Sequence, residues 1–211
     1  MIGINVLRVF RPLLSFCFAA VILTGCASSS VDMEESSRVL GKENDVRVDA
    51  QFFGLAKSVT GSNVSIVYEI ENLKSSSIAF AEMVPETSYD EEMRTFTVIV
   101  GSEVPGNQLL PRLVEIKPGE RISFNAGARL VEPRRGDLRG APARDVQLKV
   151  VYLRDPEPFR ALIGISEVAV QDPELADSMF TAWLESTESV TTNAVPLKSR
   201  LTGGAVPERP R

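Results

Sequence analysis

Apolar and polar residues alternate along much of this 211-residue chain, and this alternation limits the folds that the chain can adopt. One apolar face per segment is typical of strands in antiparallel sheets that are dry on one side and wet on the other. No helix pattern separates the segments in the way that a parallel sheet requires. The alternation therefore predicts an all-β fold, an antiparallel β-sandwich. Six segments carry it: 46–52, 64–70, 96–100, 122–130, 146–152 and 159–165.

Two turns support this interpretation. Lys117-Pro118-Gly119-Glu120 suits a type II turn, because proline fixes φ at the second position and glycine allows a positive φ at the third. Asp155-Pro156-Glu157-Pro158 cannot continue a central strand, since proline lacks the N–H that a sheet needs, so we expect it to join two strands. The predicted sandwich covers residues 45–198.

One helix, over residues 173–186, is also predicted. Asp172 can cap it and Pro173 fits its first position. Apolar residues then recur at helical spacing and form one stripe, which we expect to pack against the sandwich. The stripe consists of Ala176, Met179, Phe180, Trp183 and Leu184. Residues 190–197 are expected to add a last strand, and residues 199–211 to form a flexible tail.

The first 25 residues have the layout of a secretory signal peptide. Arg8 and Arg11 precede an uncharged run over residues 13–23, and small residues follow. An eleven-residue helix rises only about 16 Å, whereas a bilayer core is about 30 Å thick. A permanent transmembrane span is therefore not expected here.

Leu23-Thr24-Gly25-Cys26 resembles the lipobox of bacterial lipoproteins. The resemblance implies cleavage between Gly25 and Cys26, diacylglycerol on the Cys26 sulfur and an acyl chain such as palmitate on its new amine. The other cysteine, Cys17, would leave with the leader, so the mature chain could form no internal disulfide. The alternative is an ordinary signal peptide cut after Ala27. In the enterobacterial sorting pattern, aspartate directly after the cysteine retains a lipoprotein at the inner membrane. Ala27 departs from that signal, which implies the outer membrane, with the protein on the periplasmic face.

Residues 27–44, which follow the lipidated cysteine, are polar and show no strand pattern. We expect residues 26–44 to form a flexible tether. Such a tether would reach about 60 Å at most. The folded domain would then work within a few nanometres of the membrane.

Two stretches, VSIVYEIENLKSSSIAF and LVEIKPGERISF, resemble immunoglobulin-like domains of bacterial envelope proteins. Such domains often pair a strand that ends in an asparagine-containing turn with a later PGE turn that leads into a core phenylalanine. The matching residues are Glu71-Asn72-Leu73, Pro118-Gly119-Glu120 and Phe124. The Cys-Trp-Cys core of antibody domains is absent, because the one tryptophan lies in the predicted helix.

The composition disfavours several functions. The chain has no histidine, which removes the usual general base, the usual zinc ligand and the histidine-containing catalytic triads. The net charge of −5 disfavours nucleic acid as a partner, because phosphate contacts need a basic face. Asp90-Glu91-Glu92 could serve as acid and base or bind Ca²⁺, but we expect a solvated hairpin tip. We expect no metal and no cofactor.

The segment from Glu132 to Asp145 concentrates arginines, which can bind phosphate or carboxylate through two hydrogen bonds each. We therefore regard it as a candidate loop for an anionic partner. The alternative is that Glu132, Asp137 and Asp145 neutralise the loop. Its arginines are Arg134, Arg135, Arg139 and Arg144.

These observations predict a lipid-anchored envelope protein that acts as a non-enzymatic binding or accessory module. One alternative is a carboxylate-dependent envelope hydrolase. A pocket with two inward carboxylates would favour that enzyme, whereas outward acids would favour binding. The other alternative is a proteinase inhibitor of immunoglobulin-like form.

Overall fold

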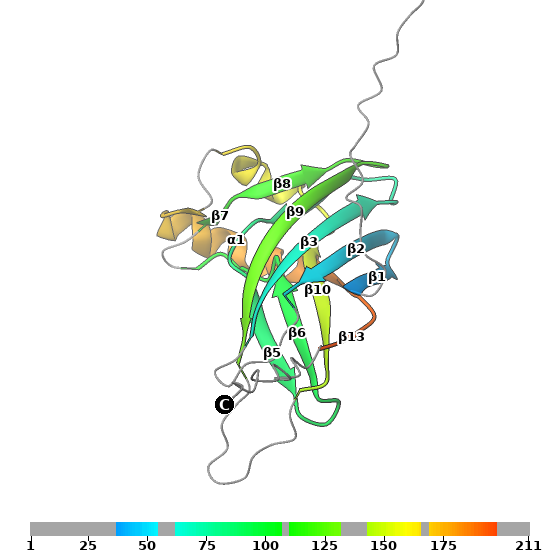
Figure 1. The fold of residues 1–211 in the computed structure, drawn as a ribbon. Coiled ribbons are helices and arrows are strands. Elements are labelled where there is room, and N and C mark those ends of the chain that lie inside the picture. Colours follow the sequence, from blue (N-terminus) through cyan, green and yellow to red (C-terminus); the bar gives the residue numbers. More distant parts are fainter. Residues whose placement is uncertain (1–36, 55–61, 107–109, 132–142, 166–168, 198–211) are drawn as a thin grey trace, which may run out of the picture. The chain divides into compact units, whose positions relative to one another are not determined.

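The computed structural model describes residues 37–54, 62–106, 110–131, 143–165 and 169–197. These residues form mostly strands, arranged in two main sheets, with one α-helix (Figure 1). The predicted all-β class is confirmed. The predicted leader, most of the predicted tether and the predicted tail lie outside the described residues.

The first sheet contains four antiparallel strands in the order β1, β2, β3, β9. Three of its strands arise from segments in which the sequence alternates, as predicted. The bounds are Arg38–Glu43 for β1, Val46–Phe53 for β2, Ser62–Asn72 for β3 and Arg121–Leu130 for β9.

Strand β1 corrects the prediction that the tether extends to residue 44. It pairs with β2 along its whole length, and Val39 is fully buried. Asn44 and Asp45 both have positive φ, as the two central residues of a type I′ hairpin turn do. Gly41 allows a close approach to the second sheet, since a Cβ there would lie 2.7 Å from the Thr191 carbonyl oxygen. The sequence hides this strand because its two apolar residues, Val39 and Leu40, are adjacent and do not alternate with polar ones.

The second sheet has the order β5, β6, β10, β4, β8, and two short strands, β12 and β13, also pair with β10. Its bounds are Glu86–Asp90 for β5, Thr95–Val100 for β6, Asp145–Leu153 for β10, Ile78–Ala81 for β4, Leu113–Ile116 for β8, Thr187–Thr191 for β12 and Val195–Pro196 for β13. A further two-stranded sheet joins β7 (Leu110–Pro111) to β11 (Ala169–Val170).

The pairing of β6 with β10 is parallel, so the prediction of a purely antiparallel fold is wrong at this position. A parallel pair needs a long crossover connection. Here the chain leaves β6, contributes β8 to the second sheet and β9 to the first, and only then returns as β10. Alternation within a strand does not indicate its direction, so the sequence could not show this pairing.

Both sheets contribute to one apolar core. Tyr68 from β3 stacks on Phe124 from β9, with ring centroids 5.5 Å apart, and Phe80 from β4 lies 4.7 Å from Phe124. The described core residues all lie between Val39 and Leu197.

Residues 159–165 do not form the predicted strand. Residues Glu157–Leu162, labelled η2, form two short 3₁₀ turns that follow Pro156 and are joined by a kink at Phe159. Phe159, at the kink, and Leu162 are the buried side chains of this segment. The apolar spacing was compatible with both structures, and the two prolines favour the turns because they remove backbone donors.

The predicted helix is confirmed as α1 (Pro173–Ser186). The Asp172 side chain accepts a hydrogen bond of 3.1 Å from the Leu175 N–H. Trp183 is buried 5.0 Å from the Phe159 ring. Only part of the predicted stripe is buried, since Phe180 and Leu184 are exposed. The strand expected over 190–197 is divided between β12 and β13.

The predicted turn over residues 117–120 is confirmed. Gly119 has a φ of +73°, and the Glu120 N–H donates to the Lys117 carbonyl at 2.9 Å. Asn72, at the end of β3, lies against this turn. Its N–H donates to the Glu120 carbonyl, and its carbonyl accepts from the Gly119 N–H at 2.7 Å. The two stretches that resemble immunoglobulin-like domains therefore contact each other.

Candidate functional site

Charged side chains gather on the outer side of the first sheet. We call this surface the polar face: the side chains of β1, β2, β3 and β9 that point away from the core. The strand register arranges them in rows across the sheet. Three rows cross all four strands: Lys42, Arg47, Glu71 and Arg121; then Leu40, Asp49, Glu69 and Ser123; then Arg38, Gln51, Val67 and Asn125.

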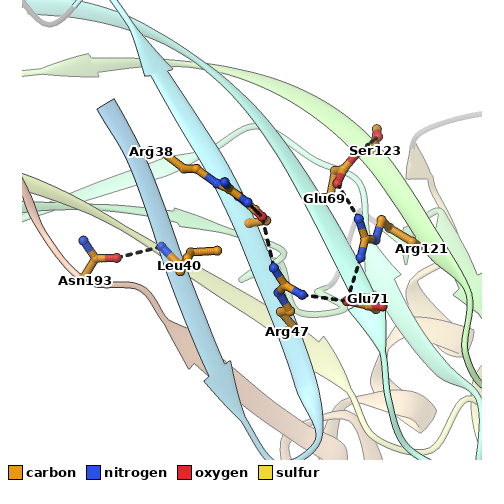
Figure 2. Close-up of polar contacts among 9 residues, drawn as sticks. Arg38, Leu40, Arg47, Glu69, Glu71, Arg121, Ser123 and Asn193 are labelled. Carbon is orange, nitrogen blue, oxygen red and sulfur yellow. Dashed lines mark hydrogen bonds and ion pairs between the residues drawn. The ribbon is translucent and has the colours of Figure 1, made fainter. Parts of the chain in front are cut away.

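The middle row places two like charges opposite each other, since Asp49 on β2 pairs with Glu69 on β3. Such a pair is destabilising unless cations lie beside it. Arg38 donates to Asp49 through both Nε and Nη2, and the Nε bond is 2.8 Å long. Arg47 adds a longer contact to Asp49, 3.4 Å from Nη2 to Oδ2 (Figure 2). Two arginines thus neutralise one carboxylate.

The other carboxylates of the polar face are held from β9. Arg121 contacts Glu69 at 3.4 Å and Glu71 at 3.0 Å, and Ser123 donates to Glu69 at 3.1 Å. Arg47 also lies 3.6 Å from Glu71, which connects the two groups (Figure 2). The ion pairs form one continuous network across β1, β2, β3 and β9.

The network is layered. The side chains of Arg38, Arg47 and Arg121 are 34–40% exposed, whereas those of Asp49 and Glu69 are at most 9% exposed. The arginines therefore lie over the carboxylates and meet the solvent. Arrangements of this kind can bind anions, because each guanidinium carries five N–H donors and the carboxylates occupy only some of them.

Gln51 lies in the third row and is almost fully buried. Its Nε2 donates to the Ser37 hydroxyl at 3.4 Å, but its Oε1 has no hydrogen-bond partner in the described residues. A buried acceptor without a partner costs free energy.

A second charged cluster lies at the rim of the core, where Glu188 accepts from Lys74 at 2.7 Å and from Tyr152 at 2.8 Å. Burial raises the pKa of Tyr152 far above its usual range, and the hydrogen bond to Glu188 adds to this. Burial alone would raise the pKa of Glu188, but the hydrogen bonds from Lys74 and Tyr152 outweigh it and lower that pKa. This cluster ties β10 and β12 to the segment after β3.

The predicted site residues are only partly described. Gly25, Cys26, Arg134, Arg135 and Arg139 lie outside the described residues. Arg144 is exposed, and its Nε lies 2.6 Å from Asp145. At Arg144, this contact agrees with the alternative that acidic residues of the segment neutralise its arginines.

The acidic segment Asp90-Glu91-Glu92 lies at the exposed turn between β5 and β6, where we expected a hairpin tip. Asp90 accepts a hydrogen bond from the Met93 N–H at 2.9 Å. In the residues that the structure describes, no three acidic or cysteine side chains come close enough to hold a metal ion.

A groove lies beside β8. It contains a single carboxylate, Glu115. Its walls come from β8, the residue before it and residues 163–165: Arg112, Leu113, Val114, Glu115, Ile163, Gly164 and Ile165.

Sequence reasoning missed the polar face. The signal was present, because charged residues occupy the outward positions of β2, β3 and β9. Their partners could be identified only once the strand order and register were known. In addition, the sequence pattern of β1, which supplies Arg38 and Lys42, predicts tether and not a strand.

Comparisons with protein-family models, with curated proteins and with solved structures found no match to this chain. Within the described residues, no helix has the length and apolar character needed to cross a membrane.

Proposed function

We propose that this protein is a lipid-anchored component of the bacterial envelope that acts by binding, with the polar face as its binding surface. The observation that carries the proposal is the N-terminal sequence, in which a basic segment and an apolar run lead directly to Leu23-Thr24-Gly25-Cys26. Two or three acyl chains on Cys26 would hold the protein at the membrane stably, because each buried CH₂ contributes about 0.8 kcal/mol. Because the residue after Cys26 is Ala27 and not aspartate, we place the protein on the outer membrane, facing the periplasm.

We also propose that the two main sheets form an immunoglobulin-like β-sandwich. Support comes from the core that both sheets share and from the contact between Asn72 and the turn at Gly119. The parallel pair β6–β10 departs from the expected topology.

Binding is favoured over hydrolysis by the surroundings of the buried carboxylates. A glycosidase of the usual type needs two carboxyl groups that face the same substrate, about 5–10 Å apart. Asp49 and Glu69 are both occupied by arginines, and the groove beside β8 offers Glu115 alone. We therefore rank the hydrolase below a binding module. Nothing in the described loops favours the proteinase inhibitor.

The lipid anchor can be tested by metabolic labelling with radioactive palmitate. We expect label in the wild type and in Cys17→Ser, but not in Cys26→Ser. The Cys17→Ser variant is the matched control, because it removes the other cysteine of the chain. Globomycin, an inhibitor of the lipoprotein signal peptidase, should cause the uncleaved precursor to accumulate. Equal labelling of Cys26→Ser and wild type would refute the anchor.

A further inference from the structure

The polar face carries a charge opposite to that of the whole chain. Its outward positions hold five basic and three acidic residues, which is an excess of +2 on a chain of net charge −5. The rest of the chain therefore carries −7. These residues are Arg38, Lys42, Arg47, Arg121, Arg129, Asp49, Glu69 and Glu71.

The positive charges are also the more accessible ones. Asp49 and Glu69 lie beneath arginines, as described above, and the Glu71 side chain is only 22% exposed, whereas Lys42 on β1 and Arg129 on β9 are exposed. The side chains of these two residues form no ion pair with a described residue. A molecule that approaches the polar face would meet basic side chains first.

Two exposed apolar side chains, Leu40 on β1 and Phe53 on β2, lie on the same face. Large apolar side chains next to basic ones are typical of surfaces that lie at a membrane interface, where the rings and aliphatic groups enter the head-group layer. The same combination also occurs in protein interfaces, so a further observation is needed to choose between them.

The position of the anchor supplies that observation. Only about 12 residues separate Cys26 from Arg38 at the start of β1, which limits the distance between them to about 43 Å in any conformation. The limit is shorter than the sequence suggested, because β1 replaces the end of the predicted tether. An anchor at Cys26 would therefore hold the start of β1, the strand that contributes Arg38, Leu40 and Lys42, within about 43 Å of the bilayer.

We propose that the polar face docks on the anionic phospholipid surface of the membrane that holds the anchor. This inference rests on the proposed function, since it requires lipidation at Cys26. The contact orients the domain: the basic face meets the head groups, while the acidic remainder is repelled from them. Because the surface potential decays over about 10 Å, only the side of the domain next to the membrane gains from this attraction.

Vesicle co-sedimentation tests the docking without the anchor. The protein is the mature chain, residues 26–211 with Cys26→Ser, which retains the whole described core. We expect it to bind vesicles that contain phosphatidylglycerol at least about tenfold more tightly than pure phosphatidylcholine vesicles at about 50 mM NaCl, and to lose this preference at about 300 mM. Equal binding to both vesicles would overturn the proposal.

The face is tested by charge reversal. Lys42→Glu with Arg129→Glu should weaken binding to the anionic vesicles about tenfold or more. The matched control, Lys149→Glu with Arg154→Glu, makes the same change in net charge on β10 and directly after it and should bind within about twofold of the parent. Equal losses in the two variants would assign the effect to net charge and overturn the role of the face. Lys42→Gln with Arg129→Gln provides a milder variant if the reversal disturbs folding.

A final measurement separates the membrane from an acidic protein partner. The parent protein should bind immobilised polyglutamate more weakly than it binds the anionic vesicles. If polyglutamate bound the parent as tightly as the vesicles do, and if Lys42→Glu with Arg129→Glu weakened that binding, the partner of the polar face would be an acidic polypeptide and not the membrane. The outcome is independent of the palmitate experiment, so failed docking with normal labelling of Cys26 would leave the proposed anchor in place.

Discussion

Replacing Asn72 with alanine should be among the most damaging changes of a polar residue in this protein. The Asn72 side chain is fully buried, and its Nδ2 donates to the carbonyl oxygens of Ser76 at 2.8 Å and Ile116 at 2.9 Å. Its Oδ1 accepts from the Lys74 N–H at 3.0 Å. One side chain thus holds the end of β3, the turn that follows it and the end of β8.

The magnitude follows from these three hydrogen bonds. Each contributes about 1 kcal/mol net, and the carbonyl of Ile116, which lies in the core, costs a further 1 kcal/mol or so when it is left without a donor. We expect Asn72→Ala to lower the free energy of unfolding by about 4 kcal/mol. With a urea m-value of about 2 kcal/mol/M for a domain of this size, the midpoint should fall by about 2 M.

Equilibrium unfolding in urea, followed by Trp183 fluorescence and far-ultraviolet circular dichroism, measures this change. Asn125→Ala is the control, because Asn125 is an exposed asparagine on β9, and it should stay within about 0.5 kcal/mol of wild type. Asn72→Asp retains the acceptor but loses both donated bonds, so it should be at least as unstable as the alanine variant. The reasoning is refuted if Asn72→Ala unfolds at the wild-type midpoint, or if Asn72→Asp is as stable as wild type.

Three further predictions concern the core, a turn and the acid response. Trp183→Ala should lower the free energy of unfolding in urea by about 3–5 kcal/mol, because Trp183 is buried against Phe159. Phe180 is exposed on the same helix, so Phe180→Ala should cost far less. Similar losses in the two variants would contradict the packing of α1. Gly101→Ala should lower the thermal midpoint strongly, because Gly101 has a φ of +76° and a Cβ there would lie 2.2 Å from the Val151 carbonyl oxygen. Gly127→Ala should leave the thermal midpoint unchanged, because a Cβ there would meet open space. Equal midpoints for Gly101→Ala and Gly127→Ala would argue against strain at Gly101. The pKa of Glu188 is lowered in the folded state, so its contribution is present above the ordinary glutamate pKa and is lost as the pH falls through the lower, folded value. Glu188→Gln should therefore make stability less dependent on pH in this acidic range, and an unchanged slope in urea unfolding across it would contradict the assignment.

Much of the fold could be predicted because local patterns specify it. The alternation in β2, β3, β6, β9 and β10 and the cap and proline at the start of α1 each act within one element. Asp172 binds a backbone N–H three residues away, so its role is visible without the rest of the chain. The turn at Gly119 is equally local, because the backbone conformation of proline and glycine determines it.

Features that depend on distant partners could not be predicted. Residues 38–43 form a strand because β2 offers them an edge and the turn at Asn44 reverses the chain, although their own pattern is weak. Residues 157–162 form two short 3₁₀ turns, and the buried Phe159 at their kink packs on Trp183, which is remote in sequence. Phe180 and Leu184 match the helical stripe but find no covering surface among the described residues.

The sequence by itself determined the all-β class, most strand positions, the helix and the resemblance of the N-terminus to a lipobox. These follow from periodicity and short motifs, which act over a few residues. Only the tertiary structure decided that β6 and β10 run parallel and that Asp49 and Glu69 lie side by side under arginines from three strands. Strand order and register bring together residues that are far apart in the chain, such as Lys74 and Glu188, which are 114 positions apart. The energy that selects this arrangement is the packing of the shared core.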